Sequence, residues 1–543
     1  MYRIRPHTFI KNTVGILVIF TGLSGAETKG LSLSSVRQLV LERNAAIQGK
    51  ILGYESKRRL MEGAKGAFDP QFLLSYQHED SNRPNTVEQR RQLEGVPNLN
   101  EQNNLYSSSL QTLTPLGGKA GITFSVSDLK NNLQNLNDPV LGATGQGERV
   151  TFLGVTLTQP LLKDAGPNAA KAAIRVAASD SEQAFQEYRR QLMITLSSAE
   201  LAYWNLYVAQ QQVKFFEESL GLTTQMQKDA ETEVKAEKSA PLKWTQAKAA
   251  VQERNGKLAM AREKLSEATL TLAGYCGLDL TESTVLRATD APPVAKSDGL
   301  DLGPALQCTL KSNPDLLGKQ AEAEAESIRT EYARNQNLPR LDLKGAYGLN
   351  GLGSSFGSSW DDVSGGSYPA WSVGVEFSIP LGNREGSNRL AAAVARRKIA
   401  ETTLADTRQQ LINGVHTALK RVRIARAGLA SYEAAVGLNR EILDSGLVEL
   451  KAGKTELRRV LEAENDLAQS KISALAALVS YHQMVLEYQM ATGQTLELRG
   501  MEISRNELTK RTAKLVRGKF VSEDEFQKFM REFRDSLSTP GQK

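Results

Sequence analysis

The chain has 543 residues, of which 40% are hydrophobic, 24% are charged and only two are cysteines. This composition excludes a disordered or collagen-like protein and allows a sizeable buried core. Aromatic residues make up only 6%, while helix-forming residues crowd the middle of the chain, which is typical of long helices rather than of a compact enzyme. The formal charge of +6 falls to +3 without Arg3, Arg5 and Lys11. That balance is too weak to indicate nucleic-acid binding.

Residues 1–26 have the features of a secretory signal peptide. Three basic residues precede an apolar run over residues 14–23, and residues 24–26 are small. No cysteine follows the run, so we expect no lipid-modified N-terminus. No later stretch reaches the ~18 uninterrupted apolar residues of a membrane-spanning helix. Any membrane crossing must therefore use a barrel of alternating strands, and a soluble exported protein is the competing interpretation.

An internal repeat organises the chain. Residues 155–162 and 375–382 are alike, 220 positions apart, and each contains the same Pro-Leu pair at the end of a strand-like run. Farther along, the offset becomes 216, since Ala202 matches Ala418 and Gly277 matches Gly493. The change of four residues is about one helical turn. The predicted divisions are a signal peptide (1–26), a first repeat (27–280), a linker (281–299), a second repeat (300–498) and a C-terminal extension (499–543).

Each repeat is predicted to contain a helix, alternating strands around a polar loop, a very long helix, a turn and another helix. In the second repeat, the apolar residues Trp371, Val373 and Val375 alternate with small or polar ones, which gives the strand one apolar and one polar face. Residues 153–157 repeat this pattern in the first copy. The apolar face of such a strand meets a core in a soluble sheet and lipid in a membrane barrel.

The first copy has a predicted hairpin, and the second copy has a predicted loop, in the region of the strands. Residues 106–113 and 121–127 alternate on either side of Gly117-Gly118 and predict a hairpin that the second copy lacks. The Gly/Ser-rich residues 345–367 lack the Lys-Ser/Thr that follows a phosphate loop. They predict an exposed loop instead.

The long helices carry a seven-residue apolar repeat. Residues 171–237 contain no Pro, and a helix of that length extends on the order of 100 Å. Apolar and small residues in steps of three and four keep one seam facing a neighbouring helix. An ordinary antiparallel bundle would explain this seam but not the amphipathic strands. The seam positions are Phe185, Tyr188, Leu192, Thr195, Ala199, Ala202, Leu206, Ala209, Val213, Phe216, Leu220 and Thr223 in the first copy and Val415, Ala418, Val422, Ala425, Leu429, Tyr432, Val436, Asn439 and Leu443 in the second.

The order of these features resembles that of the TolC family of outer-membrane efflux proteins. A signal peptide precedes strand-loop-strand segments between long heptad helices, the arrangement is duplicated, and the resemblance covers about residues 31–498. The residues that match the family are Gln159-Pro160-Leu161-Leu162 at the end of a strand, Ala202-Tyr203-Trp204 in the long helix, and Ala247 and Ala463 after the helix turns.

The resemblance implies an α+β membrane protein, a homotrimer in which a long α-helical coiled-coil barrel, the periplasmic tunnel, joins a transmembrane β-barrel. Such a protein is the outer-membrane exit duct of a tripartite efflux or type I secretion system. It passively conducts substrates from an inner-membrane transporter, to which a periplasmic adaptor (membrane fusion) protein joins it. Its barrel contacts outer-membrane lipid. A structural exported coiled-coil protein of the envelope is the alternative from another class.

Physical reasoning supports pooling of strands between chains. Two or four strands cannot close a barrel alone, because small barrels need about eight. Open sheet edges cannot face lipid, since nothing there satisfies their backbone groups. A membrane barrel built from this sequence therefore requires several chains.

In the family, the turns between paired helices form the periplasmic entrance and bind the adaptor. Glu462 follows the second-copy turn and matches a position that is often acidic and constricts the pore; Arg459 stands where another carboxylate is expected. Spaced i, i+3, these two can pair on one helix face, and a solvated charged turn is the other interpretation. The predicted docking tips are Lys238, Ser239, Ala240, Pro241 and Leu242 in the first copy and Gly453, Lys454, Thr455, Glu456 and Leu457 in the second.

No catalytic constellation emerges. His78, His416 and His482 are scattered, without a second His or Cys at ligand spacing, so we expect neither a metal site nor a cofactor nor enzymatic activity. Cys276 and Cys308 lie 32 residues apart. Export permits a disulfide between them, and two unpaired buried thiols are the alternative.

The C-terminal extension falls outside the repeat. Ser522 to Glu525 form a capping box, and the following residues share one apolar helical face. They predict a short amphipathic helix, packed on the periplasmic part of the protein, with a partner-binding or disordered tail as the alternative. The apolar residues are Phe526, Phe529, Phe533 and Leu537.

Overall fold

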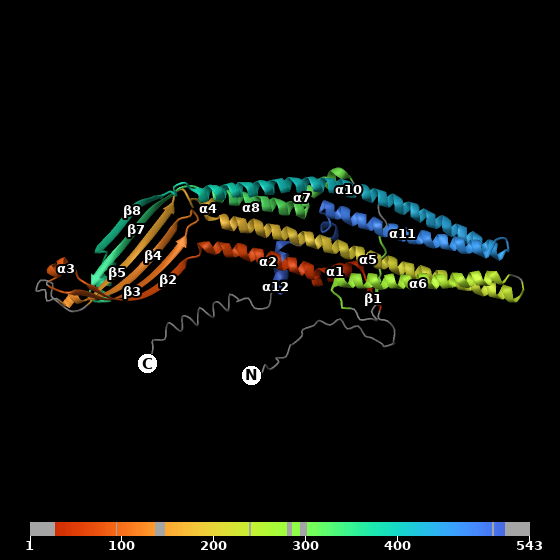
Figure 1. Cartoon of the computed structure of the whole chain (residues 1–543), viewed down its shortest axis with the longest axis horizontal. Coiled ribbons are helices and arrows are strands. Elements are labelled where there is room, and N and C mark those ends of the chain that lie inside the picture. Colours follow the sequence, from red (N-terminus) through yellow and green to blue (C-terminus); the bar gives the residue numbers. More distant parts are fainter. Residues whose placement is uncertain are drawn as a thin grey trace, which may run out of the picture. The chain divides into compact units, whose positions relative to one another are not determined.

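The computed structural model describes residues 28–93, 95–135, 147–237, 240–279, 285–293, 301–501 and 504–515 (Figure 1). The predicted signal peptide, most of the predicted linker and the predicted helix after Ser522 lie outside the described residues. Within the described parts of the chain, no helix is both long enough and apolar enough to cross a membrane.

The chain forms two compact units, and each unit takes segments from both repeats. The first unit contains the described parts of residues 1–42, 199–294 and 431–479, and the second contains those of residues 43–198, 295–430 and 480–543. The two longest helices, α5 (Ala172–Lys235) and α10 (Arg384–Lys451), run through both units. The units therefore do not coincide with the sequence repeats.

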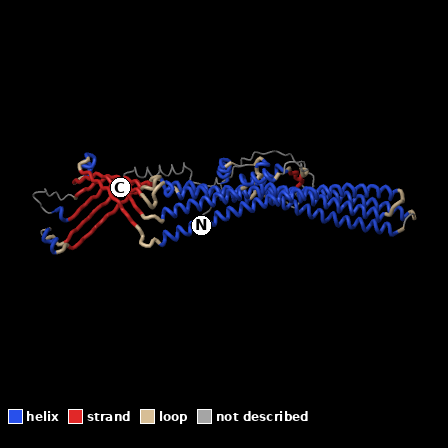
Figure 2. The backbone as a smooth tube through the Cα atoms, turned by 90° about the horizontal axis from the view of Figure 1, so that it is seen from above, coloured by secondary structure: helices blue, strands red, loops and turns tan. Residues whose placement is uncertain are grey.

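The second unit contains a six-stranded sheet in which every neighbouring pair is antiparallel. The strands, shown red in Figure 2, follow the order of the chain: β2 (Gln71–Pro84), β3 (Asn98–Leu113), β4 (Lys119–Asn131), β5 (Glu148–Pro160), β7 (Arg340–Gly353) and β8 (Tyr368–Ser378). The predicted first-copy hairpin is confirmed as β3 and β4, and both strands lie inside this sheet.

The β3–β4 turn requires a glycine. Gly117 has a φ of +86°, and a Cβ there would lie 2.2 Å from the carbonyl oxygen of Asp164. Only a residue without a side chain combines this backbone conformation with such a close approach. At the other end of β3, the short helix α3 (Val87–Gln92) connects to β2 and begins with a capping box at Thr86.

The prediction of an exposed loop over residues 345–367 is wrong. Its first part continues β7, and its second part is the helix α9 (Phe356–Gly365), which Ser355 caps at its N-terminus. Ser359 of α9 is fully buried and hydrogen-bonds Thr151 of β5 over 2.7 Å. Glycines favour loops in a sequence pattern, but here Gly351 and Gly353 let the backbone of α9 lie directly against β7.

Helices complete the second unit. Besides parts of α5 and α10, the unit contains six helices or parts of helices. These are α2 (Ala45–Lys65), α4 (Pro167–Ala170), α7 (Leu302–Ser312), α8 (Pro314–Gln336), the C-terminal part of α11 (Leu457–Thr492) and α12 (Arg505–Leu515). Val415, Ala418 and Val422 of α10 share a core with Tyr481 and Tyr488 of α11. The helix α12 was not predicted; it packs on α2, and Arg505 pairs with Glu182 of α5.

The first unit is built mainly from the ends of α5 and α10, the helix α6 (Pro241–Cys276) and the first part of α11. Its core contains Met226, Ala247, Leu443 and Val460, one from each helix. The unit also holds α1 (Leu33–Arg43) and a small parallel sheet of β1 (Thr28–Leu31) with β6 (Val285–Ala288). Because β6 lies within residues 281–299, the predicted linker contains regular structure.

Tyr203 fixes this small sheet. The Tyr203 hydroxyl is buried, donates a hydrogen bond of 3.0 Å to the carbonyl of Leu31 and accepts one of 2.9 Å from the N–H of Asp290. The two bonds tie the ends of β1 and β6 to α5. The Ala-Tyr-Trp motif of the sequence therefore has a structural role in this chain.

The predicted heptad seam is confirmed in α5, where its positions are buried except for half-buried Val213 and Leu220. In α10 the seam is buried at Val415, Ala418, Val422 and Leu443, but Tyr432 is exposed. Several buried positions of the seam carry alanine, namely Ala199, Ala202, Ala209 and Ala418, and small side chains allow helices to pack closely.

We expect Leu in place of Ala202 or Ala418 to destabilise the chain. Both alanines are buried, with 4% and 7% of their surfaces exposed, and overpacking of such a position costs ~1–3 kcal/mol. Thermal unfolding followed by helical circular dichroism measures the effect. Ala178→Leu, on an exposed position of α5, is the control. Equal melting temperatures for all three variants would contradict the proposed seam.

Candidate functional site

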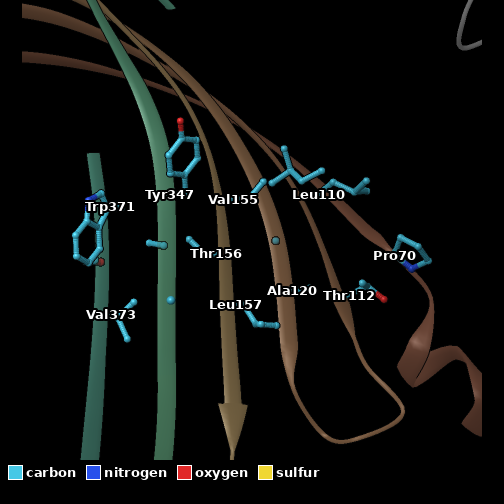
Figure 3. Close-up of a pocket in the computed structure, with 15 residues that line it drawn as sticks. Pro70, Leu110, Thr112, Ala120, Val155, Thr156, Leu157, Tyr347, Trp371 and Val373 are labelled. Atoms are coloured by element: carbon cyan, nitrogen blue, oxygen red, sulfur yellow. The ribbon is translucent and has the colours of Figure 1, made fainter. Parts of the chain in front are cut away.

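The six-stranded sheet has one continuous apolar face. Six residues are successive register partners across all six strands and form an apolar row, namely Phe72, Leu110, Ile122, Val155, Tyr347 and Trp371. Their side chains are between 44% and 75% exposed. Figure 3 shows part of this row around a shallow hollow of about 650 Å³, which Leu157 and Val373 also line. A soluble sheet would bury such a face, whereas lipid covers it in a membrane.

The opposite face is polar. The neighbouring row of register partners consists of Gln71, Gln111, Gly121, Thr156, Ala346 and Ser372. Farther along the same face, Lys344 of β7 pairs with Glu376 of β8. One apolar and one polar face is the arrangement of a sheet between lipid and water.

The helix α9 lies on the apolar face, near the strand ends that are farther from the helices. Thr151, to which Ser359 bonds, is four residues from Val155 on the same strand, so the two side chains lie on the same face of the sheet. The ring of Trp360 packs edge-on against Phe124 of β4, with 5.8 Å between the ring centroids. Phe356 and Trp360 keep 47% and 37% of their surfaces exposed. Such aromatic side chains are typical of the boundary between lipid and water.

The second-copy turn connects α10 to α11 and is closed by backbone hydrogen bonds. Gly453 has a φ of +69°, its N–H bonds the carbonyl of Leu450, and the N–H of Lys454 bonds that of Glu449. This pattern is a Schellman cap, which needs a left-handed residue such as glycine. Gly453, Lys454 and Glu456 are exposed and Thr455 is half-buried. Leu457 is buried in the helix core, so it packs inside its own chain.

The two predicted entrance residues do not pair with each other. Glu462 accepts a hydrogen bond of 2.9 Å from Arg458, at i, i+4, and both side chains are exposed. Arg459 instead lines a groove of about 620 Å³ between α10 and α11, together with Glu441 and Glu449. Of the two interpretations of this charged turn, the structure does not show the i, i+3 pair: Arg458 reaches the Glu462 carboxylate instead, at the i, i+4 spacing that also brings two side chains together on a helix.

The first-copy turn connects α5 to α6. Lys238 and Ser239 lie outside the described residues. Ala240, Pro241 and Leu242 are exposed, and Pro241 begins α6, where its missing N–H has no cost. Behind the turn, Lys243 of α6 pairs with Glu233 of α5 and joins the two arms. The described part of each predicted tip therefore presents a few exposed residues at the end of a helical hairpin.

A buried ion pair lies in the first unit, behind the turns. Arg254 of α6 and Glu464 of α11 have only 2% and 3% of their side chains exposed, and the Arg254 Nε–H donates to Glu464 Oε2 over 2.9 Å. The Ser219 hydroxyl of α5 donates to the other oxygen of the same carboxylate, and Glu253 Oε1 lies 3.1 Å from Arg254 Nη1. Together with Ser219, the ion pair thus links three helices.

The remaining polar candidates of the sequence stay apart. Among the described residues, no cluster of His, Cys, Asp and Glu could hold a metal ion. His416 is exposed and His482 is buried beside Tyr481. Cys276 and Cys308 are both free thiols, and burial raises the pKa of the Cys276 thiol to about 11. A thiol with so high a pKa is unreactive at neutral pH.

The structure thus combines an amphipathic antiparallel sheet with long paired helices. Comparison with known proteins shows what this fold resembles. Residues 305–494 match the sequence model of the family described as Outer membrane efflux protein. No curated protein matches the chain in a sequence search.

Solved structures extend the match to most of the chain. The outer membrane channel CmeC of Campylobacter jejuni aligns with a TM-score of 0.56 and 15% identity over 89% of this chain and 88% of that one. VceC of Vibrio cholerae gives 0.58 and 14% over 85% and 96%, and MtrE of Neisseria gonorrhoeae gives 0.57 and 14% over 85% and 88%. The resemblance to the TolC family is thereby confirmed, through the family match of the second copy and the fold of the chain.

Proposed function

We propose that this chain is the outer-membrane exit duct of a tripartite efflux or type I secretion system. Three chains pool their strands into one transmembrane barrel, and their helices form a tunnel through the periplasm. An inner-membrane transporter supplies the substrate and a periplasmic adaptor protein joins the two. The duct itself is passive.

The observation that carries this proposal is the continuous apolar row across the sheet. Six exposed apolar side chains in register would aggregate in water but are stable against lipid. The opposite polar face then lines a water-filled passage. Because an open sheet edge cannot face lipid, neighbouring copies must cover the edges.

Fractionation of the cell envelope tests the proposal. The protein is expected in the outer membrane, and its migration on gels is expected to change on heating, as that of folded barrels does. Recovery as a soluble monomer would overturn the duct and favour a structural coiled-coil protein of the envelope, the alternative function.

The adaptor is proposed to dock on the exposed tips of both hairpins. Ala240, Pro241 and Leu242 form the described part of the first tip, and the second tip consists of Gly453, Lys454, Thr455 and Glu456. The groove lined by Arg459 lies directly beside the second tip and combines apolar side chains with two carboxylates. Such a mixed surface suits a helical partner of matching charge.

The second tip is also proposed to form the narrow entrance, with Arg459 and Glu462 as pore residues. Truncation of both to Ala is expected to raise single-channel conductance in planar bilayers, because it removes charged side chains from the constriction. Arg459→Glu is expected to shift selectivity towards cations, since carboxylates around a narrow opening concentrate counter-ions. Arg440→Ala, at an exposed cation of α10 that lies 4.0 Å from Asp444, is the control.

Unchanged conductance and ion preference in the Arg459 and Glu462 variants would place both side chains outside the pore. The charged turn would then be a solvated surface only. The outer-membrane location and the trimer do not depend on this result, because they rest on the sheet.

A further inference from the structure

We propose that three chains close one barrel of eighteen strands, six from each chain, by pairing β2 of one chain with β8 of the next. The inference rests on the proposed function, which supplies the trimer. It adds the identity of the two edges that meet and the width of the exit. It also assigns the β3–β4 hairpin to the wall of the barrel.

The two outer strands of the sheet are open to such pairing. β2 and β8 are its first and last members. All residues of β8 are exposed, and all of β2 except one half-buried residue. Each strand therefore presents a row of backbone N–H and C=O groups along its outer edge, and this row is satisfied in a membrane only by another strand.

The directions of the edge strands fit each other. β2 follows α2 and runs away from the helices, whereas β8 precedes α10 and runs back towards them. The four strands between them alternate without exception, as Figure 1 shows. An even number of alternating strands brings edges of opposite direction together, so each of the three junctions is antiparallel like the rest of the sheet.

The apolar face also continues across the junction. Phe72 on β2 and Trp371 on β8 end the apolar row, and they are among its most exposed members at 69% and 75%. Leu110 and Ile122 place both strands of the hairpin in the same row. If the hairpin lay outside the barrel, its register with β2 and β5 would be lost. The row is therefore a continuous lipid-facing belt only when all six strands take part.

The strand number sets the width of the exit. Strands lie ~4.8 Å apart and tilt by ~40° in such barrels. Eighteen strands then give a backbone diameter of about 36 Å, whereas the twelve strands that would remain without the hairpin give about 24 Å. The exit is accordingly wide enough for a folded peptide hairpin or a helix with its side chains.

Cryo-electron microscopy of the unmodified protein in lipid nanodiscs tests the inference. A cross-section of the barrel is expected to show eighteen strands, with β2 of one chain beside β8 of the next. A trimer with twelve strands and the hairpin outside the wall would overturn the inference and leave the proposed duct intact. A soluble monomer would instead overturn the proposed function.

Two adjacent substitutions on β4 provide an independent test in cells. Ile122 belongs to the apolar row and Thr123 to the opposite face. Ile122→Arg is expected to abolish heat-modifiable trimers in the outer membrane, because it places a charge in lipid, and Thr123→Arg is expected to retain them. Equal behaviour of the two variants, whether both assemble or both fail, would overturn the assignment of the hairpin to the barrel wall.

Discussion

Glu464→Gln is expected to destabilise the chain by about 3–5 kcal/mol, the usual cost of removing one partner of a buried ion pair. The substitution keeps the size of the side chain but leaves the guanidinium of Arg254 with only the exposed carboxylate of Glu253 as a counter-charge, in a place where only 2% of the Arg254 side chain reaches water. It also weakens the acceptor that Ser219 uses. The first unit should therefore unfold at a lower temperature, measured by helical circular dichroism.

Glu462 supplies a matched control two positions away on the same helix. Glu462 also pairs with an arginine, Arg458, but here 72% of the Arg458 side chain and 59% of the Glu462 side chain are exposed. Glu462→Gln should cost less than ~1 kcal/mol, because water and salt screen such a pair. The double variant Arg254→Met with Glu464→Leu should recover much of the lost stability, since apolar side chains can replace a buried pair. Similar losses for the two single variants would contradict this account.

Gly351→Ala is expected to displace α9 from the sheet. A Cβ at this position would lie 1.8 Å from the backbone carbonyl oxygen of Ser359, and no side-chain rotation relieves a clash with backbone. We therefore expect a cost at or above the ~3 kcal/mol of strong overpacking. The hydrogen bond between Ser359 and Thr151 is lost with it.

Gly345→Ala is the control for this prediction, because Gly345 lies on the same strand and has no atom within 4 Å of an added Cβ. The readout is the accessibility of a thiol introduced as Val363→Cys, since Val363 is only 1% exposed on α9. Rapid labelling in the Gly351→Ala background and slow labelling in the Gly345→Ala background is the expected result. Slow labelling in both would show that the sheet absorbs the clash.

The duplicated strand and helix pattern could be predicted from the sequence because it is periodic. Alternation every two residues defined β8 and β5, and steps of three and four defined the seams of α5 and α10. Both signals arise because one side of a strand or helix is apolar, and they can be detected in the sequence without any knowledge of the fold. The hairpin of β3 and β4 was predictable for the same reason.

What failed depended on contacts between distant segments. Residues 345–367 look like a loop because Gly and Ser dominate them, but the glycines serve the close approach of α9 to β7. Glu462 pairs with Arg458 and not with Arg459. Both arginines have a spacing from Glu462 that allows a pair on a helix, so spacing alone could not decide between them. β6 is too short to give a periodic signal, and it exists because β1 pairs with it.

The ion pair of Arg254 and Glu464 could have been predicted from the sequence. Arg254 continues the steps of Ala247 and Val251 in α6, and Glu464 continues those of Leu457 and Val460 in α11. A charged residue on an apolar seam is buried or breaks the seam. Two such residues of opposite sign, one in each repeat, therefore predict each other as partners.

The small sheet of β1 and β6 has a consequence for how this chain reaches its native state. Thr28 pairs with Val285, which is 257 residues later, so the first strand has no partner until the whole first repeat has been made. Closing so long a loop is entropically unfavourable and slow. The boundary between the sequence repeats and the boundary between the compact units therefore differ. A fragment cut at residue 280 would keep every helix of the first repeat but would lose the strand that holds its N-terminus.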